Sequence, residues 1–241
     1  MEKTALQPKA KRTVDRFLQA LRTAYPSGLE SVAVYGSALS EDFNDRISNI
    51  NVLVVLVDTS LENLKKISAA LKKPAFAIIE PVFFTQDHIR RSLDVFPIEF
   101  LDILDRREVI FGDDIFRGLA VNHTHLRRQC EQELKAKLIV LKSTFPRART
   151  GGELKSLLLR SFTSYIHIAR NLLRLKGRQP SYRKGDVIRD LKTHFSVDTG
   201  VLEKLLELKM KNLKLSYDKA ESLLFDFVKH LDIIAEIADA F

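Results

Sequence analysis

Two short runs rich in valine constrain the fold of this chain most, because each is typical of a buried strand. They are residues 31–35 (SVAVY) and 52–57 (VLVVLV), and a polar segment that begins with Gly36-Ser37 separates them. The second run follows an alternation of polar and apolar residues, Ser48-Asn49-Ile50-Asn51-Val52. The stretch therefore predicts two strands with polar residues where the first ends and the second begins.

The rest of the first half alternates helix and strand. Apolar residues recur at helical spacing in three segments: 10–25, 61–71 and 86–93. Three further apolar runs are predicted to be strands: 76–84, 98–103 and 109–111. Pro81 places the first of these at a sheet edge or a bulge, because proline cannot donate a ladder hydrogen bond.

The second half has only helical patterns, with wide apolar stripes. The predicted helices span residues 126–145, 153–176, 184–195, 199–209 and 216–238. Such helices indicate a bundle, and the change of pattern places a boundary near residues 118–126. We therefore expect an α+β fold, with a small mixed-sheet domain at residues 1–120 and an all-α bundle at residues 121–241.

The net charge of +8 lies entirely in the second half. Residues 1–120 hold 16 Lys and Arg against 17 Asp and Glu, a net −1, whereas the remainder holds 23 against 14, a net +9. A basic helical half indicates an anionic partner or, equally, a lysine-rich solvated surface. No apolar run approaches the roughly 18 residues of a membrane helix, and Cys130 is the single cysteine. We expect a cytoplasmic protein without membrane contact.

The segment at residues 32–54 resembles the signature of the nucleotidyltransferase superfamily, whose members share the DNA polymerase β palm fold. A strand ending in Gly-Ser, Val32-Ala33-Val34-Tyr35-Gly36-Ser37, matches the first element of that signature. The second element begins another strand and reads Ser48-Asn49-Ile50-Asn51-Val52-Leu53-Val54. Its Asn49 lies twelve positions after Ser37. A small α/β domain followed by helices further resembles the antibiotic and minimal nucleotidyltransferases.

The resemblance implies a role for each matching residue. Gly36 and Ser37 take the positions that bind the nucleotide phosphates. Asn49 and Asn51 take the two catalytic positions at which the family holds metal-binding carboxylates, on one face of a strand. For a third carboxylate from a later strand we select Glu99, with Asp102 as the second choice. An active member would use Mg²⁺ and a nucleoside triphosphate, and no other cofactor is indicated.

Asparagine at both positions predicts a degenerate site that holds no metal. Mg²⁺ depends on charged oxygen ligands, and one unit-charge interaction near 4 Å is worth roughly 4 kcal/mol at an effective dielectric of 20. Losing two carboxylates removes on the order of 10³-fold or more in rate. Other acids could replace them in principle: Glu41, Asp42 and Asp45 in the loop, and Asp58 after the second strand.

Three functions remain open. The first is a degenerate nucleotidyltransferase-like protein, a pseudoenzyme that binds a nucleotide, a nucleic acid or a protein. The second is an active enzyme that transfers a nucleoside monophosphate to a small molecule, a protein or an RNA. The third is an antitoxin-like or regulatory protein that binds its partner through the basic helical half.

Several residues in the second half are candidates for other chemistry. His123 and His125 could bind a metal or lie in a turn. Arg160 and His167 resemble the Arg-x₆-His motif of HEPN ribonucleases. Cys130 is expected to have a structural role and no reactive one. The densest basic run could bind phosphates or be a solvated helix end; it comprises Arg170, Arg174, Lys176, Arg178, Arg183 and Lys184.

Overall fold

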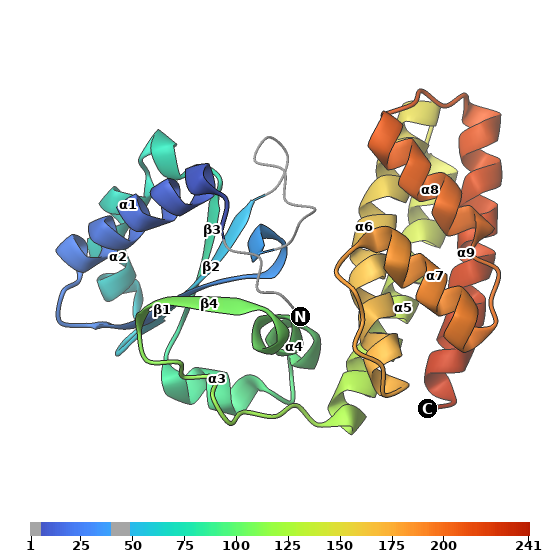
Figure 1. Ribbon diagram of the computed structural model, residues 1–241. Helices are drawn as coiled ribbons and strands as arrows, with labels where there is room; N and C mark the ends of the chain where they lie inside the picture. The colour runs from blue at the N-terminus through green and yellow to red at the C-terminus, as the bar shows by residue number, and fades with distance from the viewer. Residues whose placement is uncertain (1–5, 40–48) are drawn as a thin grey trace. The chain divides into compact units, whose positions relative to one another are not determined.

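The computed structural model describes residues 6–39 and 49–241, and for Ser37 the backbone alone. The chain divides into two compact units, Met1–Val121 and Asn122–Phe241. The first unit contains the sheet and the second is helical (Figure 1). Each unit is described separately below. No helix in the described part of the chain is both long and apolar enough to cross a membrane.

The sheet of the first unit has four strands in the order β3-β2-β1-β4. Their bounds are β1 Leu29–Tyr35, β2 Ile50–Leu56, β3 Ile79–Phe84 and β4 Arg107–Gly112. β1 pairs with β2 and β4 in antiparallel register, whereas β2 and β3 run parallel. β3 lies at an edge, so the prediction from Pro81 is confirmed, and the sheet is mixed, as the sequence predicted.

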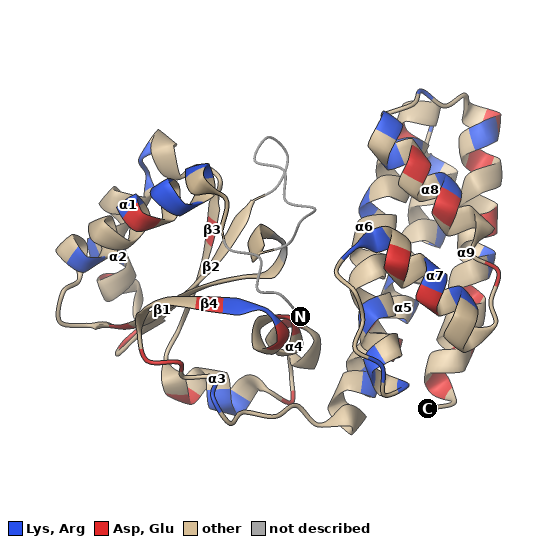
Figure 2. Cartoon of the chain, in the orientation of Figure 1, with Lys and Arg blue, Asp and Glu red and all other residues tan. Residues whose placement is uncertain are grey.

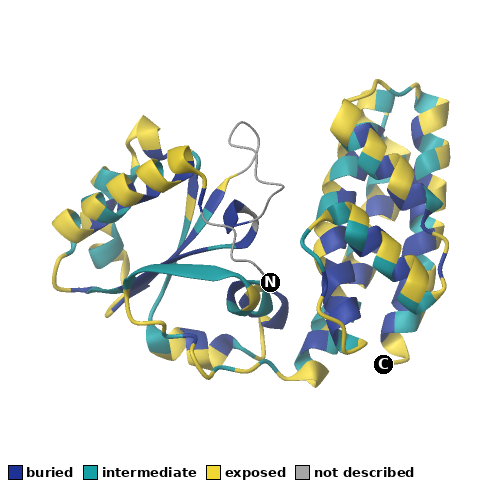
Figure 3. Cartoon of the chain, in the orientation of Figure 1, coloured by how far each residue is buried: buried dark blue, intermediate teal, exposed yellow. Residues whose placement is uncertain are grey.

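Helices cover both faces of the sheet. One face packs against α1 (Pro8–Ala24) and α2 (Leu61–Leu71), and the core there includes Phe17, Val34 and Val54. The opposite face packs against α3 (Gln86–Ser92) and α4 (Pro97–Asp105), and this core includes Leu53, Phe100 and Phe116. Buried residues therefore alternate between the two faces along β1 and β2, so the middle of both strands is dark blue in Figure 3.

Segment 98–103 is the one predicted strand that is wrong, because it lies inside helix α4. Short apolar runs do not distinguish strand from buried helix. Pro97 takes the first helical turn, where its missing N–H costs nothing, and it shares its buried face with Phe100 and Ile103 at a spacing of three. A helical apolar face thus explains the run better than the alternation of a strand.

The second unit consists of the predicted helices with small changes at their ends. They are α5 His123–Thr144, α6 Gly151–Leu175, α7 Lys184–Phe195, α8 Gly200–Lys211 and α9 Tyr217–Asp239. α6 has the longest buried face and contacts all the others. It ends one residue before the predicted bound, and Gly177 follows with φ +70° and donates its amide to the Arg174 carbonyl at 2.8 Å.

Candidate functional site

A row of polar residues crosses one end of the sheet. Tyr35 at the end of β1 pairs with Asn51 on β2, and Asn51 pairs in parallel register with Glu80 on β3. Paired residues of neighbouring strands point to the same face, so all three lie on the face that α3 and α4 cover. The next residues of β2 on that face, Leu53 and Val55, belong to its core. The row is therefore the polar end of an apolar face.

Asn49 reaches the same row from the residue before β2. Its side-chain amide donates a hydrogen bond to the Glu80 carboxylate. An ionised carboxylate only accepts hydrogen bonds, so the amide nitrogen and not its oxygen must face Glu80. The Asn49–Glu80 pair thus brings together a position that the family resemblance assigned and one that it did not.

Glu80 is a carboxylate of this row that was not among the candidates from the sequence. The sequence contained a signal for it, because Glu80 is the single acidic residue of the predicted strand 76–84. We selected Glu99 from the segment at 98–103, and that segment is helix α4, so no strand carries Glu99 to this row. Glu80 on β3 fulfils the expected geometry of a third carboxylate from a later strand.

Glu99 and Asp102 nevertheless lie in electrostatic reach of the row. Burial, followed by the charges of Asp102, Glu80 and Glu99, raises the pKa of Tyr35 to about 12. The phenol therefore stays protonated at neutral pH. The carboxylates of Asp102, Glu80 and Glu99 thus lie close enough to act on the Tyr35 hydroxyl.

Gly36 makes the turn that leaves β1. It adopts φ +75°, where glycine is favoured, and a four-residue 3₁₀ turn, Gly36–Leu39, begins there. Its amide donates to the Arg106 carbonyl at 3.2 Å. A Cβ atom at Gly36 would lie 3.3 Å from Nδ2 of Asn51, so the glycine backbone lies directly against the asparagine amide. The loop acids Glu41, Asp42 and Asp45 lie outside the described residues, and Asp58 hydrogen-bonds Ser60 and Asn63 beyond the other end of β2.

The residues of this row do not fit a two-metal site. Mg²⁺ prefers several charged oxygen ligands, whereas the row offers two neutral amides and the Glu80 carboxylate, which already accepts from Asn49. Within residues 6–39 and 49–241, no group of three His, Cys, Asp or Glu is placed to hold a metal ion. The arrangement instead presents hydrogen-bond donors.

The other candidates lie in the second unit. His123 and His125 begin α5, and residues two apart do not share a helix face, so they cannot bind one metal together. Arg160 and His167 are both exposed on α6, but His167 Nδ1 is bonded to Arg170 at 2.7 Å. Burial raises the pKa of the Cys130 thiol to about 12, so it stays protonated and inert.

The basic run does not form one exposed surface. Arg170 is 5% exposed and lies over the Tyr182 ring at 4.4 Å, and Arg174 is 9% exposed and donates to Asn171 Oδ1 at 2.5 Å. Lys176 lies over the rings of Phe195 and Phe241. Three of its six cations therefore contact neighbouring side chains of their own unit.

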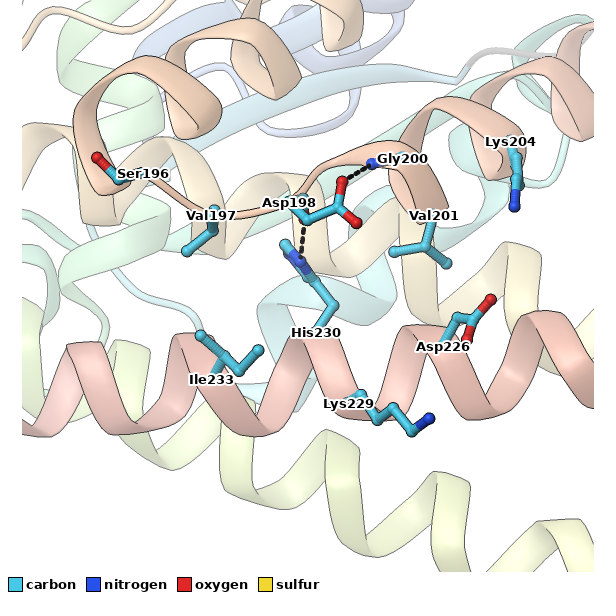
Figure 4. Close-up of a pocket in the computed structure, with 10 residues that line it drawn as sticks. All are labelled: Ser196, Val197, Asp198, Gly200, Val201, Lys204, Asp226, Lys229, His230 and Ile233. Atoms are coloured by element: carbon cyan, nitrogen blue, oxygen red, sulfur yellow. Dashed lines mark hydrogen bonds between the residues drawn. The ribbon is translucent and has the colours of Figure 1, made fainter.

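A pocket of about 400 Å³ lies between α9 and the start of α8 (Figure 4). The buried His230 lines it and connects three segments: Nδ1 donates to the Asp198 carbonyl at 3.0 Å, which leaves Nε2 to accept from the Tyr165 hydroxyl at 2.8 Å. Lys204, Asp226 and Lys229 line the same pocket. The neutral tautomer of His230 that carries its proton on Nδ1 makes both hydrogen bonds. Protonation of Nε2 would remove the acceptor of the Tyr165 hydroxyl.

The stability of the helical unit should consequently depend on pH through His230. Burial lowers the pKa of His230 below its ordinary 6.5, although the Asp198 carbonyl and carboxylate oppose this. The folded state then binds fewer protons than the unfolded state, so the stabilising contribution is complete above pH 6.5 and is lost as pH falls through the folded pKa. Urea unfolding from pH 7.5 to 5 should show this loss. H230Q should flatten the profile and H194Q should not; equal profiles for all three proteins would contradict the assignment.

Comparison with known proteins identifies the fold. No protein-family model matches the sequence, and no curated protein matches it. Among solved structures, the chain is similar to the spectinomycin adenyltransferase AAD(9) from Enterococcus faecialis, determined with ATP and spectinomycin. The TM-score is 0.62 at 12% sequence identity, over 92% of this chain and 99% of that one. This chain therefore has the α+β fold of an antibiotic nucleotidyltransferase, a mixed-sheet domain followed by helices.

Proposed function

We propose that this protein is a nucleotidyltransferase-like protein that binds a nucleotide without transferring it. The observation that carries the proposal is the hydrogen bond from the Asn49 amide to Glu80 at the place where the resemblance expects metal-binding carboxylates. The similar fold of AAD(9), whose structure contains ATP, supports a nucleotide as the ligand. The positive φ of Gly36 and the absence of a side chain there support the approach of a phosphate to the backbone beside Asn51.

A side-chain amide can donate hydrogen bonds to a phosphate, whereas a carboxylate repels it. Two carboxylates repel a triphosphate unless metal ions lie between them, because all of these groups are negatively charged. An asparagine amide is neutral and donates two hydrogen bonds, so Asn49 and Asn51 can contact phosphate oxygens directly. Binding of the nucleotide should therefore need no Mg²⁺.

Calorimetric titration of ATP into the full chain tests this. We expect dissociation constants that agree within about threefold in Mg²⁺ and in EDTA, because a tenfold difference would already require about 1.4 kcal/mol from the metal. N51A should weaken binding on the order of tenfold by removing hydrogen bonds to a charged group. N63A, on α2 and away from the row, is the matched control and should bind as the wild type does.

Two results would contradict the proposal. Tight binding in Mg²⁺ alone, with transfer of label from α-labelled ATP, would establish the active enzyme. Absence of ATP binding under both conditions would favour the interaction protein.

A further inference from the structure

The outer face of α6 carries a polar stripe in the helical unit. Ser156, Arg160, Ser164 and His167 are all exposed and recur at spacings of four, four and three. This spacing places them on one face of the helix. The opposite face of α6 is buried in the bundle core, including Leu158 at 0% exposure. The stripe is therefore a continuous surface of the helix.

Two lysines from neighbouring helices flank this stripe. Lys137 on α5 donates to Ser164 Oγ at 2.5 Å, and Lys209 on α8 donates to Thr163 Oγ1 at 2.6 Å. Burial lowers the pKa of both amines, and Lys184 adds to the effect at Lys209, while Glu133 opposes it at Lys137. Both amines donate to neutral hydroxyls, which do not neutralise their positive charge; Glu133 acts on Lys137, whereas no carboxylate contributes to the shift at Lys209.

The surface beside the stripe is hollowed. One hollow of about 490 Å³ is lined by Leu159, Arg160, Thr163, Ser164, His167 and Lys209, a set that contains no carboxylate. A second of about 540 Å³ shares Arg160 and includes Arg147. The one carboxylate among the residues that line this second hollow belongs to Glu153, and it accepts a hydrogen bond from the Arg149 backbone amide at 2.7 Å. Basic residues recur along α6 in Figure 2. We call this surface, from Arg147 to His167, the α6 groove.

We propose that the α6 groove binds a nucleic-acid strand through its phosphodiester backbone. Cations beside hydroxyl donors are the groups that contact phosphates in such complexes. The eleven helical steps from Ser156 to His167 span about 16 Å, the rise of about five nucleotides at roughly 3.4 Å each. Protein interfaces are instead centred on aromatic and apolar side chains. The apolar side chains that line the two hollows are those of Ala148, Leu157 and Leu159, and none of them is aromatic.

Fluorescence anisotropy with a labelled 20-nucleotide single-stranded RNA of mixed sequence tests the proposal on the full chain. R160Q/K209Q should weaken binding on the order of tenfold or more, and the slope of log K against log salt should fall by about 1.4, or about 0.7 for each lost phosphate contact. Backbone recognition also predicts that DNA of the same sequence binds within a few-fold of RNA.

The matched control is K204Q/K229Q, which removes the same charge from the pocket at the start of α8. It should keep the affinity and slope of the wild type. Equal losses in both double variants, or none in R160Q/K209Q, would overturn the proposal, as would equal binding of polyglutamate. R160Q/K209Q should titrate with ATP as the wild type does, so this proposal and nucleotide binding at Asn51 can fail separately.

Discussion

N49D/N51D is expected to bind Mg²⁺ on the order of 100-fold more tightly than the wild type. The two substitutions place carboxylates beside Glu80, on the row defined by the pairing of Asn51 with Glu80. Each added unit charge is worth roughly 4 kcal/mol near 4 Å at an effective dielectric of 20, and exposure of Asn49 reduces this by screening. Carboxylate oxygens are the charged ligands through which proteins bind Mg²⁺, which keeps waters at its other positions.

The thermal midpoint of the variant measures this gain. Without metal it should melt below the wild type, because three carboxylates repel one another at one end of the sheet. Saturating Mg²⁺ should restore it, since a ligand at about 100 times its Kd stabilises the folded state by about 2.7 kcal/mol. The wild type should respond little to the metal.

A third substitution separates the site from general charge effects. N49D/N51D/E80Q retains two new carboxylates and loses the third, so its affinity for Mg²⁺ should fall at least tenfold from that of the double variant. An unchanged affinity would show that Glu80 is not part of the site. If N49D/N51D bound Mg²⁺ no more tightly than the wild type, the assignment of Asn49 and Asn51 would be refuted.

G112A is expected to destabilise the first unit more than any other glycine replacement at positive φ. Gly112 adopts φ +71° at the end of β4, and a Cβ there would lie 2.0 Å from the Glu30 carbonyl oxygen. Glu30 lies at the register shift of β1 between Leu29 and Ser31, and Ser31 donates to the Asp113 carbonyl at 2.8 Å. The added methyl group must therefore separate β1 from β4.

G118A provides the matched control. Gly118 has φ +82° but nothing within 4 Å of its Cβ position, so this variant isolates the backbone strain. We expect G118A to lower the free energy of unfolding by about 1–2 kcal/mol and G112A by at least about 2 kcal/mol more. Urea unfolding followed by circular dichroism measures both, and equal losses would mean that the strands accommodate the methyl group.

The sequence predicted most elements of this fold, because their signals are local. Valine-rich runs marked β1 and β2, and Pro81 marked β3 as an edge. Segment 98–103 failed because a buried helix turn and a strand share the same short apolar run, and Pro97 was the signal that distinguished them. The sequence pointed to Arg160 on α6 but not to Lys137 and Lys209 beside it, since these two lysines come from α5 and α8.

The sequence by itself determined the identity of the residues at the candidate site: a glycine that turns the chain after β1 and asparagines where the family resemblance expects carboxylates. Tertiary structure alone decided which carboxylate joins them. Glu80 lies 29 residues beyond Asn51 and meets it because β2 and β3 pair in parallel register. Strand register depends on packing of the whole sheet, so side chains distant in sequence become neighbours only when the core forms.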